Sequence, residues 1–311
     1  MNFSFPVTDR TVFYAQYGKY IQMPNLNDLY RGGIRSLSRD VLPESRSLYG
    51  FFGQYVGFTA KPERTDQYEL GIRQTLSDNF AFILTAFYKN LRDQLRFDRF
   101  LADGTGRLAA GTPVFSGWFN NDFGTAKGLE VTLELRRVKR LSTRVNYTLS
   151  STRGTGSDSR STRVAVSDAT TTSYPTLIYS LDYNQPHRGT ILLDYRYGKN
   201  DGGKILQGLG LNAIVGFSSG HNYTKIQEPK NLGQATPWDV GVRATRDPRT
   251  CNPIEPVNSS ITPRTFNVDL NLEKLFYLSG FNIKLYANVL NAFNSKNIIN
   301  LYPTTGTDER G

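Results

Sequence analysis

Apolar and polar residues alternate along much of the chain with a period of two. Residues 266–276 read FNVDLNLEKLF, and residues 281–293 read FNIKLYANVLNAF. Successive side chains of a β-strand point to opposite faces, so each segment has one apolar face and one polar face. An α-helix with the same sequence would scatter its charges around its circumference. The alternation therefore predicts two β-strands.

The same alternation recurs, more weakly in places, over the rest of the chain. Residues 2–5 resemble the tail of an earlier strand. The total is about nine strands of about ten residues each, which is the length that a tilted strand needs to cross a bilayer. The further strands are expected at residues 12–21, 68–73, 80–97, 129–136, 141–149, 191–197 and 209–217.

The connections between these strands alternate in length. Short turns are expected at residues 76–79, 137–140, 199–208 and 277–280, and the segments between them are much longer and rich in Gly, Ser, Thr, Asn and Pro. Short turns on one rim and long loops on the other are typical of outer-membrane barrels. Soluble β-sandwiches, the main alternative, usually keep their connections short. We therefore predict an all-β fold, namely a segment of an antiparallel transmembrane β-barrel.

The two faces of each strand explain why such a sheet would lie in a membrane. In hydrocarbon every backbone polar group must be bonded internally, and a closed sheet achieves this because it has no edge. Its apolar face then meets lipid, while the polar face lines a lumen that is wide enough to be wet or plugged. The charged residues expected to face the lumen are Glu130, Glu134, Asp194, Arg196, Asp269, Glu273 and Lys284.

Composition is consistent with this interpretation without requiring it. The 311 residues include 19 Phe and 18 Tyr but only 2 Trp, and the mean hydropathy is negative. Aromatic residues suit strands and form the girdles of membrane barrels, although an aromatic-rich soluble sandwich would fit equally well. No apolar run of about 18 residues exists, so no transmembrane helix is expected. The single cysteine, Cys251, excludes a disulfide-stapled module.

The net charge of +10 fits either a solvated surface rich in arginine or attraction to anionic partners, such as lipid headgroups or an anionic ligand. Nucleic acid is not expected as a partner, because no basic helix, zinc-ligand spacing or RNA-binding aromatic pattern is present. The N-terminal residues MNFSFPVTDR lack the features of a signal peptide. Together with the polar end PTTGTDERG, this leads us to expect a fragment of a longer barrel.

Chemistry-bearing motifs are scarce. The only histidines, His187 and His221, are far apart, and a metal site needs several clustered ligands. Cys251 has no identifiable histidine to activate it, and the glycine segments at 154–156 and 208–210 do not match a phosphate-binding loop. We therefore expect no enzyme activity, no metal and no cofactor. Aromatic residues of the long loops are candidates for ligand contact, with loop packing as the alternative: Tyr49, Phe51, Phe52, Tyr55, Phe115, Trp118, Phe119 and Trp238.

Several segments resemble one known family, the TonB-dependent receptors. Residues 61–95, KPERTDQYELGIRQTLSDNFAFILTAFYKNLRDQL, resemble the Lys-Pro-Glu…Tyr-Glu-Leu-Gly hairpin of that family, and residues 13–30 resemble the strand and loop before it. Residues 124–136, GTAKGLEVTLELR, are similar to its recurrent Lys-Gly-Leu-Glu strand. Residues 287–306 are similar to its penultimate strand and last loop. These motifs occur in the family's order and cover most of the chain.

The resemblance implies a barrel of about 22 strands, plugged by an N-terminal domain. Such receptors import siderophores, cobalamin or glycans with energy delivered by TonB. Residues 1–311 would then be part of the barrel, without the plug domain and the closing strand. The implied partners are outer-membrane lipid, the plug, the remaining strands, the TonB system and an imported ligand. The alternatives are a structural or adhesive outer-membrane barrel without active transport, and a soluble β-rich protein.

Overall fold

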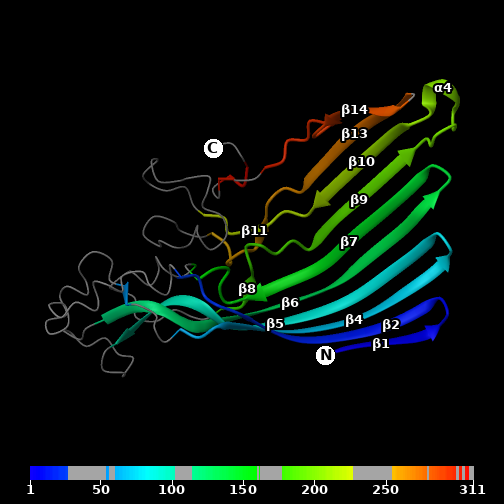
Figure 1. The fold of residues 1–311 in the computed structure, drawn as a ribbon. Coiled ribbons are helices and arrows are strands. Elements are labelled where there is room, and N and C mark those ends of the chain that lie inside the picture. The colour runs from blue at the N-terminus through cyan, green and yellow to red at the C-terminus, as the bar shows by residue number, and fades with distance from the viewer. Residues whose placement is uncertain are drawn as a thin grey trace.

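One antiparallel sheet dominates the computed structural model, which describes residues 1–26, 54–55, 60–101, 114–159, 161, 177–226, 254–278, 280–298, 301–302 and 305–307 (Figure 1). Ten strands follow one another across this sheet almost entirely in chain order, each pairing with the next. They are β1 (Asn2–Thr8), β2 (Thr11–Gln22), β4 (Glu63–Ser77), β5 (Phe80–Leu101), β6 (Val114–Val138), β7 (Leu141–Gly154), β9 (His187–Arg196), β10 (Leu209–Ser218), β13 (Thr265–Leu278) and β14 (Phe281–Val289).

Four further strands have two residues each. Strand β3 (Gln54–Tyr55) runs parallel to β6, and β8 (Tyr179–Ser180) pairs with β7. Strands β11 (Asn222–Tyr223) and β12 (Ser260–Ile261) form a separate pair. Within these ranges no helix is long and apolar enough to cross a membrane. The predicted all-β, antiparallel fold is therefore confirmed.

The short connections all lie at one end of the sheet, on the right in Figure 1. The hairpins β1–β2, β4–β5 and β6–β7 each turn within two residues, and a one-turn helix, α4 (Gly203–Leu206), lies between β9 and β10. Lys139 (φ 55°) and Gly280 (φ 93°) adopt the left-handed conformation that tight turns require. We call this end the short-turn end and the opposite one the outer end. The predicted short turns are confirmed.

Two details differ from the sequence prediction. The strand tail expected at residues 2–5 extends to Thr8 as β1, which pairs with β2. Strands β5 and β6 reach 22 and 25 residues, because their pairing resumes after irregularities between Leu91 and Arg96 and continues to Leu101 and Val114. Phe115, Trp118 and Phe119, expected in a loop, consequently lie on β6. Pairing across a bulge leaves no clean hydrophobic alternation that the sequence could reveal.

The registers give the sheet one polar and one apolar face. Directly paired residues lie on the same face, and so do residues two apart along a strand. The pairs Glu134–Arg144, Ser142–Asp194, Asp194–Asn212 and Asn212–Asn271 therefore belong to one polar face. The opposite face carries large apolar side chains that are exposed, including Leu70, Leu84, Leu129, Leu211, Leu272 and Leu285. A row of exposed leucines is the surface that membrane lipid covers.

Several glycines of the strands are covered by the side chain of their cross-strand partner. Gly71 pairs with Tyr14, and a Cβ atom at Gly71 would overlap the Tyr14 ring. Tyr14 can therefore lie across β4 and reach β5, where its hydroxyl is 2.5 Å from Thr85 Oγ1. Gly128 stands in the same relation to Phe87, and Gly189 to Phe217. Aromatic cover of this kind fixes register, because it works only when glycine and ring are directly opposite.

We predict that Gly71→Ala destabilises the folded protein by about 1–3 kcal/mol, because the Tyr14 ring must move and release Thr85. The measurement is the free energy of unfolding in urea, with the protein folded in lipid vesicles. Gly216→Ala on β10 is the matched control, since no atom lies within 4 Å of its Cβ position. In a Tyr14→Ala background the Gly71 substitution should cost much less, and an unchanged cost would contradict the assigned contact.

An ion pair links two hairpins at the short-turn end. Arg140, in the β6–β7 turn, donates from Nε and Nη2 to the Asp201 carboxylate, at 2.9 and 2.7 Å. The guanidinium also lies over the Tyr197 ring, with 4.3 Å between Cζ and the ring centroid. Hydrogen bonding from Arg140 lowers the pKa of the Asp201 carboxyl below its ordinary value of 3.8. The β6–β7 and β9–β10 connections are thus joined by a bidentate contact.

We expect Asp201→Asn to weaken the protein at neutral pH and to flatten its acid response. A carboxyl whose folded pKa is lowered contributes stability above its unfolded pKa, and this contribution is lost as pH falls through the folded value. Unfolding free energies measured from pH 6 to pH 2.5 should therefore converge for wild type and variant below pH 3.8. Asp78→Asn, at the loose 3.8 Å pair with Arg10, should change little at any pH.

Candidate functional site

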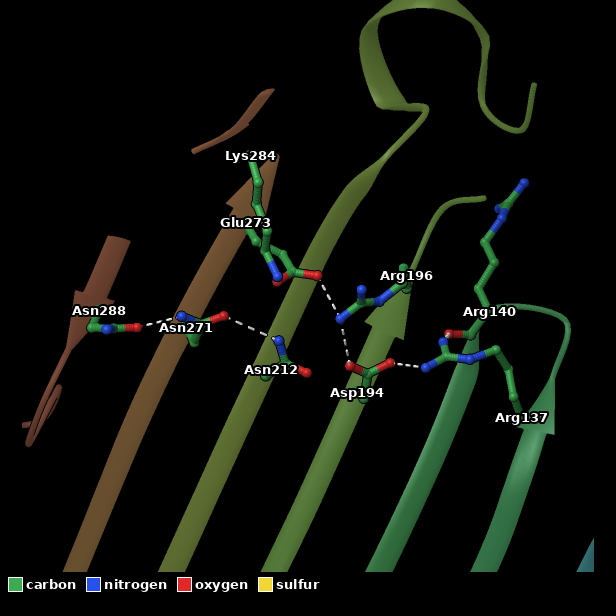
Figure 2. A network of polar contacts seen from close by, with 9 residues as sticks. All are labelled: Arg137, Arg140, Asp194, Arg196, Asn212, Asn271, Glu273, Lys284 and Asn288. Carbon is green, nitrogen blue, oxygen red and sulfur yellow. Dashed lines mark hydrogen bonds and ion pairs between the residues drawn. The ribbon is translucent and has the colours of Figure 1, made fainter. Parts of the chain in front are cut away.

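A row of charged side chains crosses the polar face near the short-turn end (Figure 2). Arg137 donates to Asp194, and Arg196 Nη2 lies 3.3 Å from the second Asp194 oxygen. The same Arg196 nitrogen is 2.5 Å from Glu273 Oε1, and Lys284 Nζ is 2.5 Å from Glu273 Oε2. Cations and carboxylates thus alternate in space from β6 to β14. We call these five residues the charged row.

The charged row depends on a glycine at its centre. Gly210 on β10 pairs with both Arg196 on β9 and Glu273 on β13. A Cβ at Gly210 would come within 2.8 Å of Glu273 Cγ, so only glycine lets the Glu273 side chain cross β10 towards Arg196. The Glu273 side chain is 8% exposed, and both of its carboxylate oxygens have a cationic partner. A carboxylate this buried needs both partners.

A neutral row of three asparagines lies beside the charged row, further from the short turns (Figure 2). Asn212 Nδ2 donates to Asn271 Oδ1 at 3.2 Å, and Asn271 Nδ2 donates to Asn288 Oδ1. The three residues are direct cross-strand partners on β10, β13 and β14. The central amide, that of Asn271, therefore both accepts and donates. We call this set the amide row.

The remaining polar residues predicted to share this face have different contacts. Glu134 binds Arg144 of β7 at 3.1 Å, while Glu130 is exposed and has no ion pair within the described residues. Asp269 accepts hydrogen bonds from Asn267 Nδ2 and the Asn291 backbone N–H, both at 2.8 Å. A hollow of about 650 Å³ borders these rows, lined by Glu134, Arg144, Asp194, Asn212 and Asn271 among others.

The outer end is held by buried polar side chains centred on Asn258. Its Nδ2 donates to Ser180 O and Asp182 Oδ1, both at 2.7 Å, and its backbone N–H donates to Thr224 Oγ1 at 2.8 Å. Asn222 Nδ2 donates to Asn258 O at 2.9 Å. The residue is 2% exposed and adopts a left-handed φ of 56°, which asparagine tolerates. One side chain thus joins three chain segments that are distant in sequence.

A second buried contact extends this outer network to β5 and β6. Arg96 Nη1 is 3.6 Å from Asp122 Oδ1, with side chains 6% and 2% exposed. Thr155 Oγ1 donates to the same Asp122 oxygen at 2.8 Å, and Tyr179 OH donates to Thr155 O at 3.2 Å. Burial raises the pKa of the Tyr179 hydroxyl, and the nearby Asp182 and Asp122 charges add to this. Tyr179 therefore stays protonated as a donor.

The predicted ligand-contact residues fall into three groups. Tyr49, Phe51, Phe52 and Trp238 lie outside the described residues. Tyr55 lies on β3 and Phe115 on β6, and the parallel pairing of Tyr55 with Gly117 brings these two segments together. Trp118 is 1% exposed and packs with Leu95 and Ala60, and Phe119 is half-buried. Packing is therefore the observed role of Trp118, and ligand contact by this set stays a prediction.

The outer network and the amide row were not identified from the sequence. Asn212, Asn271 and Asn288 each lie on the polar face of an expected strand, but only the register places them side by side. The Asn258 contacts join residues 180–182, 222–224 and 258, which no local pattern connects. The only hint in the sequence is the residue type, because asparagine tolerates the left-handed conformation that Asn258 adopts. The residue type alone does not show that conformation or the segments that it joins.

The chain belongs to the family described as "TonB dependent receptor-like, beta-barrel", whose sequence model matches residues 2–292. This family consists of outer-membrane β-barrel transporters and not of enzymes, so the predicted class and location are confirmed. A comparison with curated protein sequences finds no match. The resemblance inferred from the Tyr-Glu-Leu-Gly and Lys-Gly-Leu-Glu segments is thus confirmed by the family match.

Solved structures of similar fold are considerably longer chains. The outer membrane transporter YddB from Escherichia coli is 13% identical over 92% of this chain and 35% of its own, with a TM-score of 0.54. The FrpB iron transporter from Neisseria meningitidis is 13% identical over 99% of this chain and 36% of its own, with a TM-score of 0.54. BauA, the ferric preacinetobactin receptor from Acinetobacter baumannii, is 13% identical over 94% of this chain and 31% of its own, with a TM-score of 0.51. The chain thus spans about a third of their length and shares their fold.

We predict that Glu273→Gln destabilises the folded protein by about 1–3 kcal/mol, because Arg196 and Lys284 lose their shared carboxylate. Urea unfolding in lipid vesicles measures this free energy. Glu130→Gln is the control, since Glu130 is exposed on the same face without a described ion pair, and it should change stability by less than about 0.5 kcal/mol. Equal effects of the two substitutions would show that the charged row adds no stability.

A double-mutant cycle isolates the Glu273–Lys284 contact from other effects of each substitution. Lys284→Met and Glu273→Gln should be non-additive by about 0.5 kcal/mol or more, because each single substitution already removes the contact. The pair Lys284→Met and Glu130→Gln should be additive, since these residues are on different strands and are not in contact. A coupling of zero for Glu273 and Lys284 would contradict the assigned ion pair.

Proposed function

We propose that the chain is part of the barrel of an outer-membrane receptor that imports a scarce nutrient with energy from TonB. Support comes from the family match over residues 2–292, together with ten strands joined by short turns at one end. The apolar face would contact outer-membrane lipid. The strands β1 and β14 stand at the two sides of the ten-strand order, and the remaining strands of a full-length barrel would pair with them.

The polar face would line the lumen under this proposal. Glu130, Glu134, Asp194, Arg196, Asp269, Glu273 and Lys284 share that face by register. Most of these charges are paired within the sheet itself, so few of them need a charged partner on the plug. The plug domain would pack against this wall, and the TonB system would act through the plug. Transport would then move the plug past a rigid polar surface.

The proposed class of ligand is inferred from the family and from the solved structures of similar fold. FrpB is described as an iron transporter and BauA as a ferric preacinetobactin receptor. We propose a ligand of the siderophore, cobalamin or glycan class for this chain. Among the aromatic residues predicted to contact a ligand, the half-buried Phe119 on β6 would do so at the outer end. The structural or adhesive alternative would require none of these ligands.

The proposal is tested by deleting the gene and measuring growth when iron, cobalamin or a glycan is the limiting nutrient. We expect slow growth under one of these limitations, because the receptor concentrates a nutrient that porins admit too slowly. Uptake of labelled ferric chelate, cobalamin or glycan should fall at least tenfold and return with the intact gene. The same uptake should stop in a strain without TonB or with a protonophore.

Two outcomes separate the alternatives. Normal growth and uptake under all three limitations, combined with a leaky outer membrane in the deletion strain, would support a structural barrel and overturn the transport proposal. Uptake that continues without TonB would overturn the energised mechanism. A variant with Asp78→Asn serves as a control for expression, since Asp78 lies in the β4–β5 turn outside the strands and should leave uptake unchanged.

A further inference from the structure

A second hollow, of about 550 Å³, lies at the outer ends of β9, β10 and β13. Phe217 pairs with Phe266 and Gly189, and His187 is two residues from Gly189, so all of these lie on the apolar face. Pockets of about 300–1,000 Å³ are large enough to hold small molecules. Its lining residues are His187, Phe217, Ser218, Ser219, Arg264, Thr265 and Phe266.

Aromatic rings form an apolar shelf beside this hollow. The Phe217 and Tyr147 rings stack with centroids 6.4 Å apart, and they meet over Gly189, the partner of both residues. Any larger residue at position 189 would displace the Phe217 ring. Phe266 continues the shelf on β13 as the direct partner of Phe217. Aromatic residues in such a row mark the interface between membrane and water.

Hydrogen-bond donors stand next to the shelf. The Tyr147 hydroxyl and His187 Nδ1 are 2.7 Å apart, and when Tyr147 donates, the ring proton of His187 lies on Nε2. Arg264 is exposed, and the residues that line the hollow include no acid. A guanidinium binds phosphate oxygens with two parallel hydrogen bonds. The hollow therefore combines a cation, a ring nitrogen that can donate a hydrogen bond and apolar rings at one end of the sheet.

We infer that this hollow binds a phosphorylated, acylated lipid of the external leaflet of the outer membrane. Arg264 and His187 would hold the phosphate, and the acyl chain would lie against Phe217 and Phe266. An anionic amphiphile fits because the site is cationic above and apolar below, at the depth where headgroups meet acyl chains. The inference requires that the protein lies in the outer membrane with the outer end of its sheet facing the outside of the cell. It does not depend on transport.

The test uses the protein expressed from its whole natural gene, folded in detergent without lipid and examined by native mass spectrometry. Three probes are titrated: a phosphorylated lipid A, the same lipid without phosphates, and inorganic phosphate. We expect the phosphorylated lipid to bind about tenfold more tightly than the dephosphorylated one, because charge-assisted contacts are lost. Inorganic phosphate should bind far more weakly, since it cannot use the aromatic shelf.

Variants then assign the binding to this hollow. Arg264→Gln should weaken binding of the phosphorylated lipid about tenfold, and Arg264→Lys should retain most of it. Arg10→Gln, an exposed arginine at the short-turn end, is the matched control and should bind as the wild type does. Circular dichroism checks that each variant is folded. Both arginines are exposed, so their substitution should not disturb folding.

Three results would overturn the inference: equal binding of the dephosphorylated lipid, unchanged binding by Arg264→Gln, or inorganic phosphate binding as tightly as the lipid. Nutrient uptake by Arg264→Gln is measured in parallel. A protein that binds the lipid but imports nothing would leave this inference standing and overturn only the proposed transport. A protein that imports its nutrient but shows no lipid preference would overturn this inference and leave the proposed transport standing.

Discussion

The structure depends on the pairing of backbone N–H and C=O groups between neighbouring strands. In a membrane no water replaces a missing partner, so each strand must be paired along its length. Nine consecutive antiparallel pairings, from β1–β2 to β13–β14, meet this demand between the ten strands of the described sheet. The pairing fixes the register, and the register determines which side chains become neighbours. Both polar rows of the polar face and the aromatic shelf of the apolar face follow from it.

Glycine has a specific part in this arrangement. Where two long side chains must meet across an intervening strand, the residue between them has no side chain: Gly210 lies between Arg196 and Glu273, and Gly189 between Tyr147 and Phe217. Glycine normally weakens a strand, because it costs conformational entropy and packs poorly. Here the covering side chain offsets that cost. The glycine of the Tyr-Glu-Leu-Gly segment, Gly71, has the same relation to Tyr14. A larger residue at this position would overlap the Tyr14 ring, which is the physical reason for glycine there.

Much of the fold was predictable from the sequence because the period of two is a local property. Residues 266–276 and 281–293 showed it clearly, and β13 and β14 lie where it indicated. Face assignment followed for Asp194, Arg196 and Glu273. The extension of β5 and β6 was missed, because their irregular pairing around Gln94 depends on the partner strand and not on local alternation. The Asn258 network was missed for a similar reason, since its contacts span residues 180 to 258.

The two ends of the sheet are stabilised in physically different ways. At the short-turn end Arg140 and Asp201 are partly exposed, and water screens such a pair, so its contribution to stability is modest. At the outer end Asn258, Thr224 and Asp122 are buried, and a buried polar group that loses its partner costs far more than an exposed one. The outer network therefore has few alternative arrangements of comparable energy. It gives the ends of β7, β9, β10 and β13 one defined geometry, on which a receptor surface can be built.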